Sequence, residues 1–245
     1  MNNGTLKQIL LITDGCSNQG EDPVAMAALA REAGITVNVI GVMENDLIDE
    51  KGMREIEGIA ASGGGISQVV MAEQLSQTVQ MVTRKAMTQT LQGVVNRELR
   101  QILGNNRTSI EELPPDERTE VMEVVDELGE KSDVEVLILI DTSASMKSKL
   151  ATVKESLLDL SLSLNARLGN NRFAVLIFPG KRKQVEKLLD WTPELELLTS
   201  IFPKLAIGGI TPTGPAIKEA LGYFKKKPSW RGLLTDDDQY TEESM

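Results

Sequence analysis

The stretch VEVLILIDTSASM, residues 134–146, is an apolar run that ends on one carboxylate and two hydroxyl side chains. The five consecutive apolar residues 136–140 leave no polar face, so they predict a strand buried on both sides of a parallel sheet. Asp141, Ser143 and Ser145 then follow at every second position. Ligands of open α/β sheets bind outside the carboxyl ends of the strands, and hard oxygen groups suit Mg²⁺ or a similar cation. The stretch therefore indicates an α/β fold with a cation site at a strand end.

The composition narrows the chemistry that is available to such a site. The 245 residues include no histidine and a single cysteine, Cys16. This excludes zinc sites of the usual Cys/His kinds, a Ser-His-Asp triad and an intramolecular disulfide. The formal net charge of −10 argues against nucleic acid or an anionic membrane surface as a partner.

The apolar segments also bear on the location of the protein. The first residues, MNNGTLKQILLITDG, hold too few apolar side chains in a row for a signal-peptide core. No apolar stretch approaches the length that a bilayer crossing needs. One cysteine agrees with a reducing compartment, so we expect a cytoplasmic protein.

The first part of the chain, residues 1–75, predicts a small parallel sheet that cannot stand alone. Its pattern indicates strands over 7–13, 35–42 and 66–71, a helix from the Asp22-Pro23 pair to Gly34, and a helix near 52–61.

Residues 76–132 are predicted to form a helical connector. A long helical pattern covers 73–103, and Pro114-Pro115 starts a second helix that runs to Gly129. The apolar stripes between 75 and 102 favour packing against the sheet over a coiled coil.

The α/β pattern resumes over residues 133–230. It predicts an amphipathic helix over 150–168, a buried strand over 172–178, an antiparallel edge strand over 184–191 and a helix near 194–205. The last helix is expected to hold Pro212 in its first turn, with Thr211 as its N-cap. Residues 231–245 are an acidic tail.

Three motifs in these contexts resemble those of the von Willebrand factor A (VWA) domain. They are DTSAS at 141–145, the Thr-x-x-Gly from Thr211 to Gly214, and LLITDG at 10–15. In that family D-x-S-x-S, a loop threonine and a loop aspartate build a metal-ion-dependent adhesion site. The resemblance implies a doubly wound, mostly parallel, Rossmann-like α/β sheet, with the two halves and the connector forming one domain.

The order of the motifs differs from that of the family, in which D-x-S-x-S comes first and the aspartate last. Here the aspartate half, residues 1–75, precedes the other, so the chain looks like a circularly permuted VWA domain. The family strand order 3-2-1-4-5-6 implies that the strands before Asp14 and Asp141 are neighbours, although these residues are 127 positions apart.

The resemblance also implies a ligand set for Mg²⁺ or Mn²⁺. Ser143 and Ser145 would bind through their hydroxyls, Thr211 directly or through water, and Asp141 and Asp14 largely through water. The cation would keep an open position for an Asp or Glu carboxylate of a partner protein. No catalytic residue and no other cofactor is implied.

Simpler interpretations of the same residues exist. Ser143 and Ser145 could merely cap the following helix, Thr211 could act as an N-cap, and Asp14-Gly15 could be an ordinary turn. Asp236 in GLLTDD could replace Asp14, but the strand pattern before it is weaker.

Two other functions compete with metal-dependent protein binding. A hydrolase or phosphatase could use the same cation, although the chain lacks a second Asp of a D-x-D motif, a phosphate-binding glycine loop and a histidine base. A scaffold could self-associate through its helices as a homodimer, in which Asp14 of one copy completes the site of the other.

Overall fold

A single mixed sheet lies at the centre of the described fold. The structure, a computed structural model, describes residues 4–43, 50–103, 109–205 and 207–225. Its six strands lie in the order β3-β2-β1-β4-β5-β6. They are β1 (Thr5–Thr13), β2 (Ile35–Met43), β3 (Gly64–Met71), β4 (Asp133–Asp141), β5 (Asn171–Phe178) and β6 (Glu186–Thr192). All neighbours are parallel except β5 and β6, which are antiparallel. The predicted α/β fold with a doubly wound, mostly parallel sheet is confirmed.

The central pair of strands joins the two ends of the sequence. β1 and β4 are parallel, with Leu10 beside Ile138 and Ile12 beside Ile140. All four side chains are fully buried, as expected for strands covered on both faces. The neighbours predicted from the motif order are therefore adjacent, and their carboxyl ends bring Thr13 and Asp141 to one edge of the sheet.

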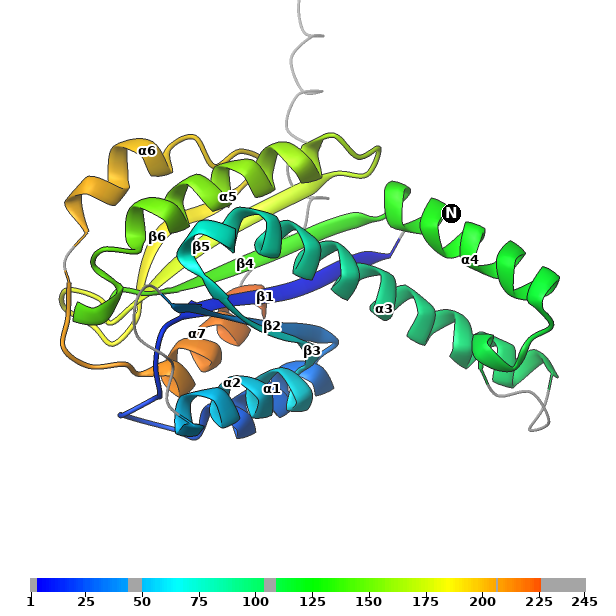
Figure 1. Cartoon of the computed structure of the whole chain (residues 1–245), viewed down its shortest axis with the longest axis horizontal. Coiled ribbons are helices and arrows are strands. Elements are labelled where there is room, and N and C mark those ends of the chain that lie inside the picture. The colour runs from blue at the N-terminus through cyan, green and yellow to red at the C-terminus, as the bar shows by residue number, and fades with distance from the viewer. Residues whose placement is uncertain (1–3, 44–49, 104–108, 206, 226–245) are drawn as a thin grey trace, which may run out of the picture.

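Helices cover both faces of the sheet (Figure 1). One face carries α1 (Pro23–Glu32), α2 (Glu50–Ser62) and α7 (Thr213–Lys225), and the other carries α3 (Leu75–Leu103), α5 (Leu150–Asn165) and α6 (Leu198–Ile201). The alternation of side chains along β1 feeds both layers: Leu10 and Ile12 belong to the core beneath α3 and α5, and Ile9 and Leu11 to the core beneath α1, α2 and α7.

The helix α3 has two environments. Leu75, Val79 and Val82, in its first half, are fully buried in the core shared with α5. Its second half extends beyond the strands and packs on α4 (Pro115–Lys131), and α4 leads directly into β4 (Figure 1). The preference for packing on the sheet over a coiled coil is thus confirmed for the first half, and the helical arm lies on the side of the strands' amino ends. The division into two halves, connector and tail stays a prediction, and the tail lies outside the described residues.

The helix expected near 194–205 is wrong in extent. Only Leu198–Ile201 is α-helical, and a 3₁₀ turn over Phe202–Lys204 follows. Pro203 lacks an N–H and therefore cannot continue the α-helical hydrogen bonds.

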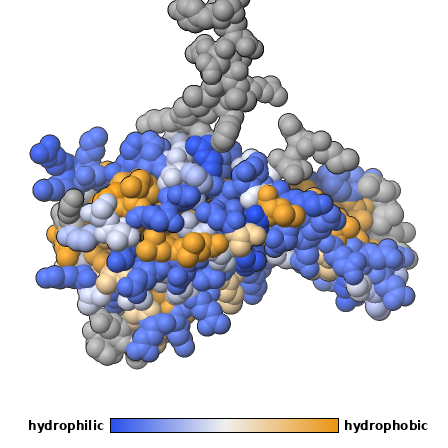
Figure 2. All heavy atoms as spheres, turned by 90° about the horizontal axis from the view of Figure 1, so that it is seen from above, coloured by the Kyte–Doolittle hydropathy of each residue, from blue (hydrophilic) through white to orange (hydrophobic). Residues whose placement is uncertain are grey.

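The face seen in Figure 2 is largely hydrophilic, and its apolar side chains gather in separate patches. The most exposed large apolar side chains include Leu168, Leu162 and Leu197, at 78%, 65% and 59%. Among the described residues, no helix combines the length and the apolar character that a membrane crossing requires.

Candidate metal centre

Asp141 lies at the carboxyl end of β4 and is fully buried. Its Oδ1 accepts a hydrogen bond of 2.8 Å from the Ser143 N–H, an Asx turn, and its Oδ2 accepts one of 2.7 Å from the Thr13 hydroxyl of β1. Burial raises the pKa of Asp141 from 3.8 to about 6, although both hydrogen bonds lower it and the nearby negative charge of Asp14 raises it further. Burial therefore makes the charged form of Asp141 unfavourable, and the hydrogen bonds from Thr13 and Ser143 hold its carboxyl group in one orientation.

The two serines connect this carboxylate with Asp14. The Ser143 and Ser145 hydroxyls lie 3.2 Å apart, and the Ser145 hydroxyl donates to Asp14 Oδ1 at 2.8 Å. Ser143 is the N-cap of a 3₁₀ turn over Ala144–Met146, but its side chain makes no capping hydrogen bond. The interpretation of the serines as mere helix caps is therefore wrong, since Ser145 Oγ is directed to a carboxylate 131 positions away.

The loop after β1 is fixed by contacts on two sides. The Ser17 N–H donates to Glu55 of α2 at 2.6 Å. Burial raises the pKa of Glu55, and the Ser17 hydrogen bond opposes this rise. On the other side, Asn18 accepts from the Thr211 N–H at 2.8 Å and donates to the Thr211 carbonyl at 3.1 Å. The loop that carries Asp14 is thus bound directly to the loop that carries Thr211.

Thr211 is buried, but it is not the N-cap of α7. The helix begins at Thr213, and the first helical carbonyl acceptor is that of Pro212, which binds the Ala216 N–H. Both predictions, Pro212 in the first turn and Thr211 as N-cap, are therefore wrong. The physical reason is that the helical donor to the Thr211 carbonyl would be Pro215, which has no N–H, so this carbonyl accepts from the Asn18 N–H instead.

Four of the five expected ligands thus form one hydrogen-bonded group, comprising Asp14, Asp141, Ser143 and Ser145. The contacts that bring Thr211 to this group run through its backbone. Asp14 reaches Ser145 of its own chain, so a second copy is not needed to deliver this carboxylate. The rival Asp236 lies outside the described residues.

Two residues of the site escaped the sequence analysis. Thr13 holds Asp141, and its position directly after the apolar run of β1 is a signal that the strand register could have revealed. Lys149 lies at the start of α5, and its Nζ is 2.6 Å from Asp14 Oδ2. A lysine in a polar turn does not by itself indicate a contact with a distant carboxylate.

The donor chemistry fits a hard divalent cation. Oxygens that occupy adjacent corners of an octahedron around Mg²⁺ lie about 3.0 Å apart, given metal–oxygen distances near 2.1 Å. The spacing of 3.2 Å between the two serine hydroxyls, which are expected to bind directly, agrees with this value. Among the described residues no group of three His, Cys, Asp or Glu side chains is placed to hold a metal, so the two aspartates would depend on hydroxyl and water ligands.

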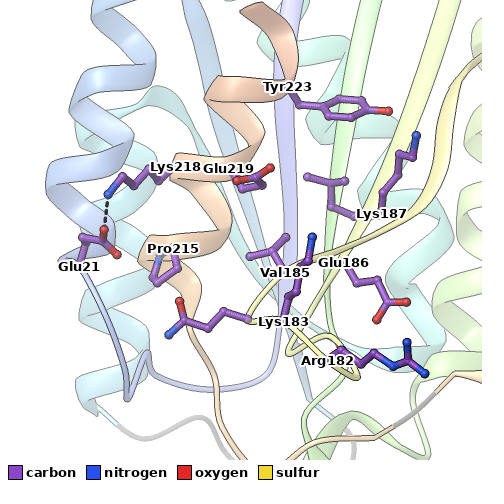
Figure 3. Close-up of a pocket in the computed structure, with 12 residues that line it drawn as sticks. Glu21, Arg182, Lys183, Val185, Glu186, Lys187, Pro215, Lys218, Glu219 and Tyr223 are labelled. Atoms are coloured by element: carbon purple, nitrogen blue, oxygen red, sulfur yellow. Dashed lines mark hydrogen bonds and ion pairs between the residues drawn. The ribbon is translucent and has the colours of Figure 1, made fainter. Parts of the chain in front are cut away.

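A separate hollow of about 750 Å³ lies between α7 and the segment that joins β5 to β6 (Figure 3). Arg182, Lys183 and Lys187 line one side, and Lys218, which is paired with Glu21, lies on the other. None of the five expected metal ligands lines this hollow.

Comparison with known proteins agrees with this geometry. Residues 1–85 and residues 136–237 each match the von Willebrand factor type A domain. The Uncharacterized protein YabS of Bacillus subtilis (strain 168) is 66% identical over 243 residues, which are 99% of each chain. This chain belongs to the von Willebrand factor type A domain family. The family resemblance drawn from the motifs is confirmed.

The VWA fold of the chain also has a relative of known structure. An uncharacterized protein from Alicyclobacillus acidocaldarius subsp. acidocaldarius DSM 446 has a crystal structure that superposes with a TM-score of 0.83. It is 41% identical, and the likeness covers 90% of this chain and 94% of that one. The circular permutation of the VWA halves stays a prediction.

Proposed function

We propose that this VWA domain is a non-enzymatic, metal-dependent protein-binding module. Asp14, Asp141, Ser143, Ser145 and Thr211 would hold Mg²⁺ or Mn²⁺ and present it to an Asp or Glu carboxylate of a partner protein. The observation that carries the proposal is the contact between Ser145 and Asp14, which brings the two motif loops into one oxygen cluster.

The exposure of the cluster supports capture of a large partner. Asp141 and Ser143 are buried, whereas Ala144 and Ser145 are exposed. A cation bound among these oxygens would have protein ligands on its inner side and solvent beyond Ser145. Because Asp141 and Asp14 are expected to act largely through coordinated water, the cation would have few direct anionic ligands and would keep positive charge for an incoming carboxylate. When bound, the cation would attract the partner carboxylate electrostatically. The side chains of this domain would fix the position of the cation.

Two hollows in the described structure lie apart from the expected ligands. The hollow in Figure 3 and a second one of about 860 Å³, lined by Asp133, Arg167 and Asn171 among others, contain none of the five expected ligands. A cytoplasmic location is part of the proposal and rests on the use of a single cysteine.

The first experiment measures cation binding and partner capture together. We expect wild-type protein to bind Mn²⁺ in a calorimetric titration, and Asp141→Ala and Ser143→Ala each to weaken binding at least about 100-fold. The same two variants, and wild type in EDTA, should lose a partner that wild type retains in Mg²⁺. Circular dichroism establishes that the variants are folded.

Asp126→Ala is the matched control, since Asp126 is an exposed carboxylate on α4. It should behave as wild type in every assay. Partner capture that survives EDTA and Asp141→Ala would overturn the proposal, as would phosphoester turnover that requires Asp141.

A further inference from the structure

The ion pair between Lys149 and Asp14 differs in burial from the surface pairs of this protein. The side chains of Lys149 and Asp14 are only 11% and 3% exposed. Those of Lys187 and Asp190, which are equally close, are 49% and 63% exposed. A carboxylate removed from water needs a counter-charge, and the Lys149 ammonium supplies it.

This ammonium engages the carboxylate that is expected to face the cation. Asp14 Oδ2 lies 2.6 Å from Lys149 Nζ, and Asp14 Oδ1 accepts from Ser145, itself an expected ligand. A divalent cation bound by Ser145 and Asp14 would therefore lie close to the ammonium, and the two positive charges would repel each other.

We propose that Lys149 is the resident cation of the metal-free site, and that a divalent cation enters by displacing its ammonium from Asp14. This inference rests on the proposed metal-binding function and adds its regulation. Lys149 neutralises Asp14 without metal and raises the cation concentration at which the site fills.

The chemistry of lysine suits such an exchange. Its ammonium is a compact charge on a flexible stem of four carbons, so it can leave Asp14 by rotation of the side chain without movement of α5. The backbone of Ser145 would stay in the 3₁₀ turn that precedes α5. A carboxylate from a partner would then meet the divalent cation, and the released ammonium would remain nearby as a second positive charge.

The test compares Lys149→Met, which keeps the length of the stem and removes the charge, with wild type. Calorimetric titration with Mn²⁺ should give an affinity at least about tenfold higher for Lys149→Met, because the competing charge is gone. The metal-free variant should unfold at a lower temperature than metal-free wild type, and saturating Mn²⁺ should reduce this difference. Lys147→Met is the matched control, since Lys147 is an exposed lysine of the same turn, and it should change neither quantity.

A second measurement needs no variant and decides the question if Lys149→Met does not fold. Wild type is treated briefly with an amine-acetylating reagent, with and without Mg²⁺, and the modification of each lysine is read by mass spectrometry. Mg²⁺ should increase the modification of Lys149 several-fold relative to Lys147.

The outcomes separate this inference from the function on which it rests. Wild type that binds Mn²⁺ with an affinity equal to or above that of Lys149→Met, or whose Lys149 stays equally protected with Mg²⁺, would overturn the exchange and leave the metal site intact. Absence of Mn²⁺ binding by both proteins would overturn the proposed function, and the exchange with it.

Discussion

The two ends of the central strands both enclose charged side chains, but their partners differ in kind. At the amino end, the buried Arg167 donates from Nε to the Gly129 carbonyl at 3.0 Å, from Nη2 to the Ser132 carbonyl at 2.7 Å, and from Nη1 to Asn171 at 2.6 Å. At the carboxyl end, Asp14 is held by the side chains of Lys149 and Ser145.

The difference shows which charged group can be exchanged. The Arg167 acceptors are mainly backbone carbonyls at the end of α4 and in the α4–β4 connection, and these cannot turn away without moving the chain. Side chains can rotate, so the charges around Asp14 can be replaced by another cation. The amino end therefore joins the helical arm to the sheet, and the carboxyl end is suited to bind.

A glycine supports the same view of the amino end. A Cβ at Gly169, in the α5–β5 turn, would lie 2.1 Å from the Ser132 carbonyl oxygen, which no side chain could tolerate. The Gly169 N–H donates to the Glu130 carbonyl at 2.8 Å. Two backbone segments thus meet here in direct contact, and Arg167 donates to the Gly129 and Ser132 carbonyls beside them.

The largest effect is expected from Arg167→Met, which removes the charge and leaves three acceptors without their donor, two of them buried (Asn171 and Ser132) and one half-buried (Gly129). We expect a loss of about 3 kcal/mol in the free energy of unfolding, measured by urea denaturation, since each unsatisfied buried group costs about 1 kcal/mol or more. The affinity for Mn²⁺ should not change, because Arg167 acts at the opposite end of the strands.

Arg97→Met, at an exposed position of α3, is the control and should leave stability within about 0.5 kcal/mol of wild type. If Arg167→Met instead weakened Mn²⁺ binding while stability stayed unchanged, the assignment of separate roles to the two ends would be wrong.

The carboxyl end of the central strands could be predicted from the sequence better than the amino end. Buried apolar runs such as 136–140 identified the strands, and the motif order placed the strands before Asp14 and Asp141 side by side, so the fold and the clustering of four expected ligands could be predicted. The partners of Arg167 could not, because they are mainly backbone carbonyls, which every residue has. Lys149 was missed for a related reason, because its contact with Asp14 depends on how one loop packs on another. The start of α7 could have been placed correctly, because Pro215 has no N–H to donate to the Thr211 carbonyl.

A smaller effect is expected from Thr13→Val, which removes the hydroxyl that holds Asp141 and preserves the shape of the side chain. The lost hydrogen bond to a buried carboxylate should lower the free energy of unfolding by about 1–2 kcal/mol. The affinity for Mn²⁺ should fall about tenfold, as when a group that orients a ligand is removed.

Thr36→Val provides the comparison within the same sheet, since the Thr36 hydroxyl bonds Thr90 of α3 away from the aspartates. It should leave Mn²⁺ affinity unchanged. Equal Mn²⁺ affinities for wild type and Thr13→Val would show that the orientation of Asp141 does not depend on β1.

The smallest effect is expected at the exposed pair of Lys187 and Asp190. It serves as the reference for the effects at the two buried ends of the strands. Hydrogen bonds from Lys187, from the Tyr223 hydroxyl and from the Trp191 N–H lower the pKa of Asp190 from 3.8 to about 2. Because the folded pKa lies below the unfolded one, the stabilisation is present above pH 4 and is lost as the pH falls towards 2. Tyr223→Phe should raise the Asp190 pKa, as followed by NMR titration, yet cost less than about 0.5 kcal/mol at pH 7, since solvent screens the pair. A loss at pH 7 as large as that of Arg167→Met would show that burial does not separate the fixed charges of this domain from its surface pairs.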